Sequence, residues 1–419
     1  MEIISQRVAG LDVHKKTVMA AVRVPDPEGG ERLEIVKQFS TFYCDLICLR
    51  KWLNQHGVTD VAMEATGIYW VPVWRVLEQG DFEELILANP GHIKAVAGRK
   101  TDVKDACWIA QLLECGLVPP SFVPPREIFE LRQLTRYRRK TIEGRSREIL
   151  RVQKLLEDAG IKLDSVISNV MGVSGREMLD ALIAGERDVD VLSEMAHGKM
   201  RNKREDLKLA LEGLFDSHHH AKLLQTHLDC IDAYSATVER LNAEIVAKTC
   251  DYSKEIQLLM TITGIGRKTA EIIIAEIGID MSRFRTANHL ASWAGLCPGN
   301  HESAGKQKSG RARTGCPALR SALVESAWAA ARVQDSYFSA QFRRFCRRFG
   351  KKSEKKAAFA VAHSLLVTIW HVLNYGVEFE DLGANHFNNV VDNKEVLKRR
   401  KIKELESLGY VVTCSEAAA

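Results

Sequence analysis

The stretch Gly10-Leu11-Asp12-Val13-His14-Lys15 lies inside an alternating, β-branched segment that runs from Val8 to Val24. This period of two predicts a β-strand that is buried on at least one face. The segment from Arg32 to Ser40 can return as its partner across a turn of the composition Pro-Asp-Pro-Glu-Gly-Gly. The chain is therefore expected to open with a β-hairpin, with Asp12 projecting from its first strand.

Shorter elements are predicted after this hairpin, and they alternate between helix and strand. They are a helix over 44–56, a strand over 60–65, a helix over 68–79, a strand over 85–88 and a helix over 102–115. The order of hairpin, helix, strand, helix, strand and helix is that of an RNase H-like (RuvC-like) domain. We therefore predict an α/β domain of this kind over residues 1–124.

Four carboxylates stand in short signatures of this first domain: Asp12, Glu64 in Met-Glu-Ala-Thr-Gly, and Asp102 and Asp105 in Lys-Thr-Asp-Val-Lys-Asp. Asp12 would project from the first strand and Glu64 from the end of a later one. The pair at i and i+3 would share one face of the final helix, so all four can meet at one sheet edge. Such a set suits one or two Mg²⁺ ions acting on a phosphodiester. Any one of them alone could instead be a turn or cap residue.

Composition sets outer limits on the protein. The 419 residues are 46% hydrophobic, which allows two or three domains with real cores, and the formal net charge is +5. The ten cysteines show no zinc-ribbon spacing, and neither a signal peptide nor an apolar run of membrane-spanning length is found. We expect a cytoplasmic protein that has no membrane partner. No P-loop or dinucleotide fingerprint is present, which disfavours ATP hydrolysis and redox chemistry.

A region of long, charged, amphipathic helices is predicted over residues 125–255, because 126–154 and 203–248 carry leucines at helical spacing. A helical hairpin or coiled coil is the expected architecture. The first stretch is unusually basic, so we expect contacts with a phosphate backbone, although a solvated helix face would explain many of the charges. The basic residues concerned are Arg136, Arg138, Arg139, Lys140, Arg145 and Arg147.

A third, mainly helical region is predicted over 256–385, followed by a charged tail over 386–419 to which we assign no role. Thr263-Gly264-Ile265-Gly266 before an apolar helix is typical of a helix-hairpin-helix element that approaches phosphate, or of a plain turn. A polar loop over 299–311 contains serines among cations. The expected nucleic-acid contacts here are Gly264, Gly266, Lys268, Lys306, Lys308, Arg311, Arg313, Arg343, Arg344, Arg347 and Arg348.

The motifs taken together resemble those of a known family. Gly-Leu-Asp-Val-His-Lys, Met-Glu-Ala-Thr-Gly, Lys-Thr-Asp-Val-Lys-Asp-Ala, Gly-Ile-Gly, Ala-Gly-Leu-Cys-Pro and Ser-Ala-Gly-Lys follow one another in the order of the DEDD-type insertion-sequence transposases, the IS-one-ten family. The resemblance covers about residues 7–375. It implies a site-specific DNA recombinase with a RuvC-like domain, a coiled-coil region and a transposase domain that bears a serine. It also implies a protein associated with a bacterial or archaeal nucleoid.

The resemblance also implies site residues and partners. Asp12, Glu64, Asp102 and Asp105 fall on the metal-binding tetrad, and Ser303 falls on the serine that attacks the scissile phosphate and forms a phosphoserine linkage. Many relatives place glycine directly after that serine, where this chain has Ala304, and Ser309 also precedes a glycine. The implied partners are donor and target double-stranded DNA, a structured bridge RNA that guides the choice of both, and further copies of the chain in a dimer or tetramer.

Two other functions compete with this one. A structure-specific nuclease of the Holliday-junction-resolving kind would use the same carboxylates on metal-activated water, and it would need no serine and no third region. A non-enzymatic nucleic-acid scaffold would use the carboxylates as helix caps. The intact set of four carboxylates argues against the scaffold, and the serine loop argues against the nuclease.

Overall fold

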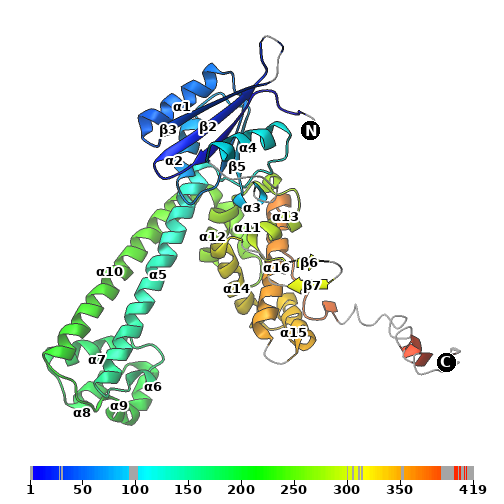
Figure 1. Ribbon diagram of the computed structural model, residues 1–419. Helices are drawn as coiled ribbons and strands as arrows, with labels where there is room; N and C mark the ends of the chain where they lie inside the picture. The colour runs from blue at the N-terminus through cyan, green and yellow to red at the C-terminus, as the bar shows by residue number, and fades with distance from the viewer. Residues whose placement is uncertain are drawn as a thin grey trace. The chain divides into compact units, whose positions relative to one another are not determined.

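A computed structural model of the chain (Figure 1) divides into two compact units, Met1–Val123 and Pro124–Ala419. For residues 91, 92, 102–104, 301–303 and 306–309 it describes the backbone alone. The residues described are 3–27, 29, 32–93, 102–299, 301–303, 306–309, 312, 315–350, 353–387, 401–403, 405–406, 410 and 412.

The first unit is built on a mixed sheet of five strands in the order β3-β2-β1-β4-β5. β2 pairs antiparallel with both β1 and β3, whereas β1, β4 and β5 run parallel. The strands are β1 Val8–Val13, β2 Thr17–Val24, β3 Leu33–Ser40, β4 Asp60–Glu64 and β5 Glu84–Ala88. The predicted α/β class of this region is confirmed.

The segment from Val8 to Val24 is two strands, which corrects the prediction of a single one. A tight turn over 14–16 joins them, with the His14 amide donating to the Thr17 carbonyl at 2.9 Å, and Val13 pairs with Val18. Every residue of β1 is buried, so the strand cannot continue through three consecutive polar residues. The second strand then pairs with β3 as expected, with Thr17 opposite Ser40.

Helices cover both faces of this sheet. α1 (Tyr43–Gln55) and α2 (Trp70–Leu77) pack on the face formed by Ala9, Leu11 and Val13. α4 (Asp102–Glu114) packs on the opposite face, which includes Val8, Ala62 and Ile86, and the short α3 (Pro90–Ile93) adds Ile93 to that core. Residues with even numbers in β1 and β4 therefore face α4, because side chains alternate along a strand.

The second unit begins with two long helices, α5 (Arg126–Asp158) and α10 (His219–Lys248), which run side by side in Figure 1. They are antiparallel, since Lys248 pairs with Glu130 at 2.9 Å and His227 pairs with Glu148 at 3.0 Å. The expected continuous helix over 203–248 is interrupted between α9 and α10. Small helices with their own apolar core connect the pair: α6 Leu163–Val166, α7 Val173–Ala184, α8 Val189–Glu194, η1 Gly198–Lys203 and α9 Arg204–Leu211.

The remainder of this unit is a helical bundle that carries one small hairpin. Its helices are α11 Ser253–Met260, α12 Arg267–Ile277, α13 Ala287–Ala294, α14 Pro317–Ala331, α15 Tyr337–Phe349 and α16 Glu354–Tyr375, with the 3₁₀ turns η2 Cys250–Tyr252 and η3 Met281–Arg283. The hairpin strands are β6 His301–Ser303 and β7 Lys306–Ser309.

α16 is the core helix of this bundle. Eight of its residues are buried, among them Val361, Leu365 and Ile369, and it contacts α11, α13, α14 and α15. Within the described part of the chain it is also the one helix with the length and apolar composition of a membrane span. The core helix of a bundle meets the same two criteria, so this composition alone identifies no membrane segment.

Candidate catalytic and nucleic-acid-binding sites

Two of the predicted site carboxylates, Asp12 and Glu64, lie on adjacent parallel strands at the carboxyl ends of β1 and β4. Leu11 pairs with Met63 in the register of these strands, so the next residues along, Asp12 and Glu64, are neighbours. Both have even numbers and therefore face α4. Asp12 is only 6% exposed. The sheet thus brings these two carboxylates together on one face.

α4 brings the remaining two positions to the same end of the sheet. Its last residue, Glu114, accepts a hydrogen bond from Arg23 at 2.8 Å, and Arg23 pairs with Val8 at the start of β1. α4 therefore runs antiparallel to β1. Gly10 lies beneath the turn from Ala106 to Ala110.

A distance argument places the start of α4 beside Asp12. Asp12 lies two residues beyond Gly10, or about 7 Å along the strand. Moving about 6 Å back along the helix from the middle of the 106–110 turn reaches the turn that holds residues 102–105. Asp105 is half-buried there. The side chain of Asp102 lies outside those described.

Asp12 has a hydrogen-bond partner that the sequence did not single out. Nε2 of His14 lies 3.0 Å from Oδ2 of Asp12, and the His14 side chain is 46% exposed against 9% for Asp12. His14 is two residues beyond Asp12, and this spacing on one face was the signal available. The contact orients a carboxylate that is otherwise largely removed from water.

The chemistry of this donor set fits a hard divalent cation. Carboxylate oxygens are the ligands that Mg²⁺ prefers, and a nearly buried Asp12 needs a cation or hydrogen-bond donors to remain ionised. Among the side chains that the structure describes, no three His, Cys, Asp or Glu groups are arranged to hold one metal ion. The tetrad of Asp12, Glu64, Asp102 and Asp105 as metal ligands therefore stays a prediction.

The serine loop contains a short antiparallel hairpin. Ser303 ends β6 and pairs with Lys306 across the turn, whereas Ser309 ends β7 at the base of the hairpin, opposite His301. The two candidate serines thus occupy different ends of one small element. The side chains of Ser303, Ser309, Lys306 and Lys308, and all of Arg311 and Arg313, lie outside what the structure describes.

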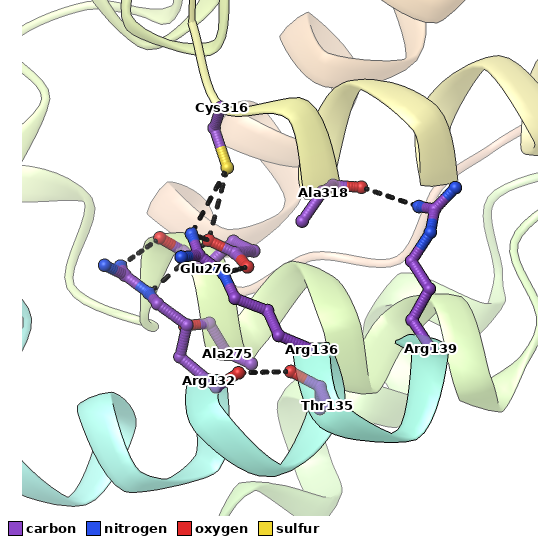
Figure 2. A network of polar contacts seen from close by, with 8 residues as sticks. All are labelled: Arg132, Thr135, Arg136, Arg139, Ala275, Glu276, Cys316 and Ala318. Atoms are coloured by element: carbon purple, nitrogen blue, oxygen red, sulfur yellow. Dashed lines mark hydrogen bonds and ion pairs between the residues drawn. The ribbon is translucent and has the colours of Figure 1, made fainter. Parts of the chain in front are cut away.

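The residues that follow the hairpin are tied to α5 and α12 by a buried polar network (Figure 2). Arg136 binds the fully buried Glu276 carboxylate with two hydrogen bonds of 2.7 and 2.8 Å, and the Cys316 thiol donates to the same carboxylate at 3.2 Å. Arg132 donates to the Glu276 backbone carbonyl at 2.7 Å. Hydrogen bonding to Glu276 raises the pKa of Arg136, and burial raises the pKa of Cys316. The network holds the start of α14 against α5 and α12.

The basic residues of α5 divide into paired and open ones. Arg138 is 4% exposed and donates to Glu271 at 2.8 Å, so it serves the α5–α12 contact, and a phosphate contact does not fit its burial. Arg139 contacts Glu143, Glu325 and the Ala318 carbonyl.

The other three predicted residues of α5 differ in accessibility. Lys140 pairs with Glu143 at 2.8 Å but stays 72% exposed, and Arg145 donates to Ser235. Arg147 is exposed and has no ion pair with any described carboxylate. Arg147 is therefore the predicted residue of α5 that is most open to a phosphate.

The glycines between α11 and α12 have different surroundings. Gly264 has φ +91°, and a Cβ there would clash with Ser326 and Ala330 of α14, so close packing within the bundle accounts for it. Gly266 caps α12 and has open space around it, next to the exposed Lys268. Within the predicted helix-hairpin-helix element, the N-terminus of α12 is therefore the part that is open to an anion.

Four exposed arginines lie on α15, in agreement with the density of charge seen in the sequence. Among the described residues none of them forms an ion pair with a carboxylate, and Arg344 lies over the Phe387 ring at 5.2 Å. Uncompensated cations on one short helix form a surface suited to a phosphate backbone. They are Arg343, Arg344, Arg347 and Arg348.

Comparisons with known proteins find similarity to transposases. A protein-family model for the DEDD transposases of IS110, described as Transposase, matches residues 9–161. A second family model, described as Transposase IS116/IS110/IS902 family, matches residues 256–343. The chain is 29% identical over 154 residues to a probable family 20 transposase of Pseudomonas aeruginosa, which is 36% of this chain and 45% of that protein.

Two further relatives are also matched over part of their length. A pilin gene-inverting protein of Moraxella bovis is 32% identical over 159 residues, which is 36% of this chain and 48% of the relative. A putative transposase, y4rJ, of Sinorhizobium fredii is 33% identical over 127 residues, or 29% of this chain and 31% of the relative. The alignments span less than half the length of the curated relatives.

Proposed function

Because the chain belongs to the IS116/IS110/IS902 family of transposases, we propose that it is the DNA transposase of an insertion sequence, a recombinase that cuts and rejoins DNA. The observation that carries the proposal is the placement of Asp12 and Glu64 as neighbours on parallel strands, beneath the start of α4. Carboxylates at such an edge are suited to chemistry on a phosphodiester.

The first unit is proposed to be RuvC-like, with an RNase H fold. Its strand order, with three antiparallel strands followed by two parallel ones, and the helix α4 across β1 support this assignment. In such an arrangement the catalytic carboxylates come from β1, from the end of β4 and from α4. These are the elements that carry Asp12, Glu64, Asp102 and Asp105.

Asp12, Glu64, Asp102 and Asp105 would together hold one or two Mg²⁺ ions. When bound, the metal neutralises charge that develops on the phosphate oxygens during strand cleavage. The protein supplies a nearly buried position for Asp12 and a hydrogen bond from His14 that orients its carboxylate. The start of α4 adds the positive end of a helix dipole beside these anions.

Ser303 is the proposed nucleophile. Its hydroxyl oxygen forms a bond to phosphorus, the bond from phosphorus to one DNA oxygen breaks, and that oxygen leaves as a hydroxyl that carries the proton. The phosphoserine ester keeps the energy of the original bond, so religation needs no ATP. The distance of Ser303 beyond the Leu-Cys-Pro segment and the Gly-Lys that follows it favour Ser303 over Ser309.

The proposed partners are donor and target DNA, a bridge RNA that pairs with both, and further copies of the chain. The exposed arginines of α15 and the exposed Arg147 of α5 support contact with nucleic acid backbone. A nuclease that resolves Holliday junctions with metal-activated water is the second candidate, because the carboxylate arrangement alone would serve it equally well.

The test uses purified protein with its co-purifying RNA, Mg²⁺ and end-labelled donor DNA. We expect a protein–DNA adduct that survives SDS and disappears in Ser303→Ala but persists in Ser309→Ala. Clean cuts with free ends and no adduct would favour the nuclease. Loss of the adduct in Ser309→Ala alone would move the nucleophile to Ser309.

A further inference from the structure

An apolar cavity of about 630 Å³ lies between α15, α16 and the segments that flank the serine hairpin. Its walls include Pro298, Ala312, Phe345, Phe349, Phe359 and His363. This volume falls in the range of small-molecule sites, which are mostly apolar with a few placed polar groups. The catalytic site proposed above does not use any of these residues.

The aromatic walls favour a flat ligand. The Phe345 and Phe349 rings are nearly parallel, 7° apart in plane and 5.7 Å apart in centroid, and Phe349 is 43% exposed although it is apolar. A phenylalanine ring can stack on any of the nucleobases, because every nucleobase has a π face. Small residues, Ala312 and Ala360, keep the space between the walls open.

The charges around the cavity favour an anionic ligand. Lys355 and Lys356 belong to its wall, and none of its described lining residues is a carboxylate. A second cavity of about 350 Å³ shares Phe345 and is lined by Arg344 and Arg348. A planar group attached to phosphates, which is a nucleotide, matches an aromatic cavity bordered by cations.

His363 adds a polar group to the aromatic wall. Its Nδ1 is buried and has no hydrogen-bond partner among the described residues. Burial lowers the pKa of His363, so the imidazole is neutral at neutral pH. The imidazole hydrogen-bonds to the backbone of Leu296, so His363 shapes the wall of the cavity.

The cavity lies next to the proposed nucleophile. Pro298 precedes β6 by three residues, and Ala312 follows β7 by three residues. Ser303 is five residues from Pro298, so it lies within about 18 Å of the cavity wall even if the chain between them is fully extended. A nucleotide held in the cavity would therefore be within a few nucleotides of a phosphate attacked by this hairpin.

We propose that this cavity receives an unpaired nucleobase of the DNA strand that is cut, stacked on Phe349 and Phe345, with Lys355 and Lys356 on its flanking phosphates. The inference rests on the proposed function, because it takes the DNA strand near Ser303 as the source of the base. Holding one base out of the stack would fix the strand near the scissile phosphate.

The test measures binding of the full-length protein to labelled single-stranded DNA by fluorescence anisotropy, with an abasic strand of equal length that keeps the phosphates. We expect the wild type to bind the strand with bases about tenfold more tightly, which is the scale of one base stack. Phe349→Ala should remove most of that preference and leave affinity for the abasic strand unchanged. Tyr375→Ala, which removes an exposed aromatic of α16 outside the cavity, should keep the preference.

Three outcomes would overturn the inference: a preference for bases that survives in Phe349→Ala, an equal loss in Tyr375→Ala, or a Phe349-dependent preference seen with RNA of the same length and not with DNA. Unchanged thermal unfolding of both variants shows that the fold is intact, and Phe359→Leu provides a second, milder change of the wall. The adduct assay on wild-type protein reads the proposed function separately, so a transposase without this pocket would show an adduct but no Phe349 effect.

Discussion

Gly10 in β1 lies directly against the backbone of Ala106 in α4. A Cβ at Gly10 would overlap the Ala106 carbonyl oxygen and the Ala110 amide nitrogen, and it would lie 3.0 Å from the Cβ of Ile109. A helix can approach a strand this closely only where the strand lacks a side chain. This contact fixes the position of α4 along β1 and thereby brings residues 102–105 beside Asp12.

Gly10→Ala should therefore destabilise the first unit by about 2 kcal/mol, because the backbone of α4 must move away from β1. Strand cleavage should fall as well, since Asp105 moves with the helix. Thermal unfolding and a cleavage assay measure the two effects. Gly266→Ala is the control for stability, because no atom lies within 4 Å of its new Cβ. Equal stability of Gly10→Ala and wild type would refute the close contact.

The reactivity of Cys107 reports the same packing of α4. Burial, followed by the hydrogen bond to Glu34, raises the pKa of this thiol to about 12. At pH 8 its thiolate fraction is on the order of a thousand times smaller than that of a thiol with the ordinary pKa of about 8.5. Iodoacetamide should thus label the exposed Cys44 well before Cys107, as measured by peptide mass spectrometry.

The pH dependence of this labelling has a defined direction. Labelling of Cys107 should keep rising with pH above pH 10, because the raised pKa delays ionisation of this thiol. Glu34→Gln should lower the pKa of Cys107 and speed its labelling. If Cys107 reacted as fast as Cys44 at pH 8, the position of α4 over β3 would be wrong.

Arg138 and Arg147 lie on the same helix and should respond oppositely to removal. Arg138→Ala leaves Glu271 buried without its main partner and should cost roughly 3 kcal/mol of stability. Arg147→Ala should leave stability unchanged and weaken nucleic-acid binding. Chemical unfolding and anisotropy titrations distinguish the two. The paired change Arg138→Met with Glu271→Leu should recover most of the stability. If Arg138→Ala were as stable as the wild type but bound nucleic acid poorly, the predicted contact of Arg138 with phosphate would be supported instead.

The arginines of α15 should determine part of the salt dependence of binding. The slope of log K against log salt concentration should fall by about 1 for each phosphate that the protein no longer neutralises, so by about 2 in Arg347→Gln with Arg348→Gln. Arg176→Gln is the control, because Asp180 and Asp232 already hold that arginine. An unchanged slope in the double variant would leave α15 as a solvated face.

The fold of the first unit was predictable because its signals are local. Side chains alternate between the two faces along β1 and β4, so Asp12 and Glu64 could be placed on one face. The apolar spacing of α4 predicts the helix that carries Asp105. The break after Val13 was missed because His14-Lys15-Lys16 contains none of the glycine or proline that marks most turns.

The buried ion pairs of the second unit could not be predicted, because their partners lie far apart in the sequence. Arg138 and Glu271 are 133 residues apart in the chain, and the charge pattern of α5 does not show that α12 buries its middle. The hairpin over 301–309 has polar strands without apolar alternation, so it resembles a loop. The role of Glu276 in binding both Arg136 and the Cys316 thiol likewise depends on residues from three separate helices or their caps.

The most direct test of the account is Mg²⁺-dependent strand cleavage by Asp12→Asn, which removes one charge and keeps the shape of a nearly buried side chain. We predict that cleavage falls to background while nucleic-acid affinity and the unfolding midpoint match those of the wild type, and that Asp81→Asn, an exposed carboxylate of the same unit, cleaves normally. Cleavage by Asp12→Asn at the wild-type rate, in protein of unchanged fold, would contradict the catalytic site proposed here.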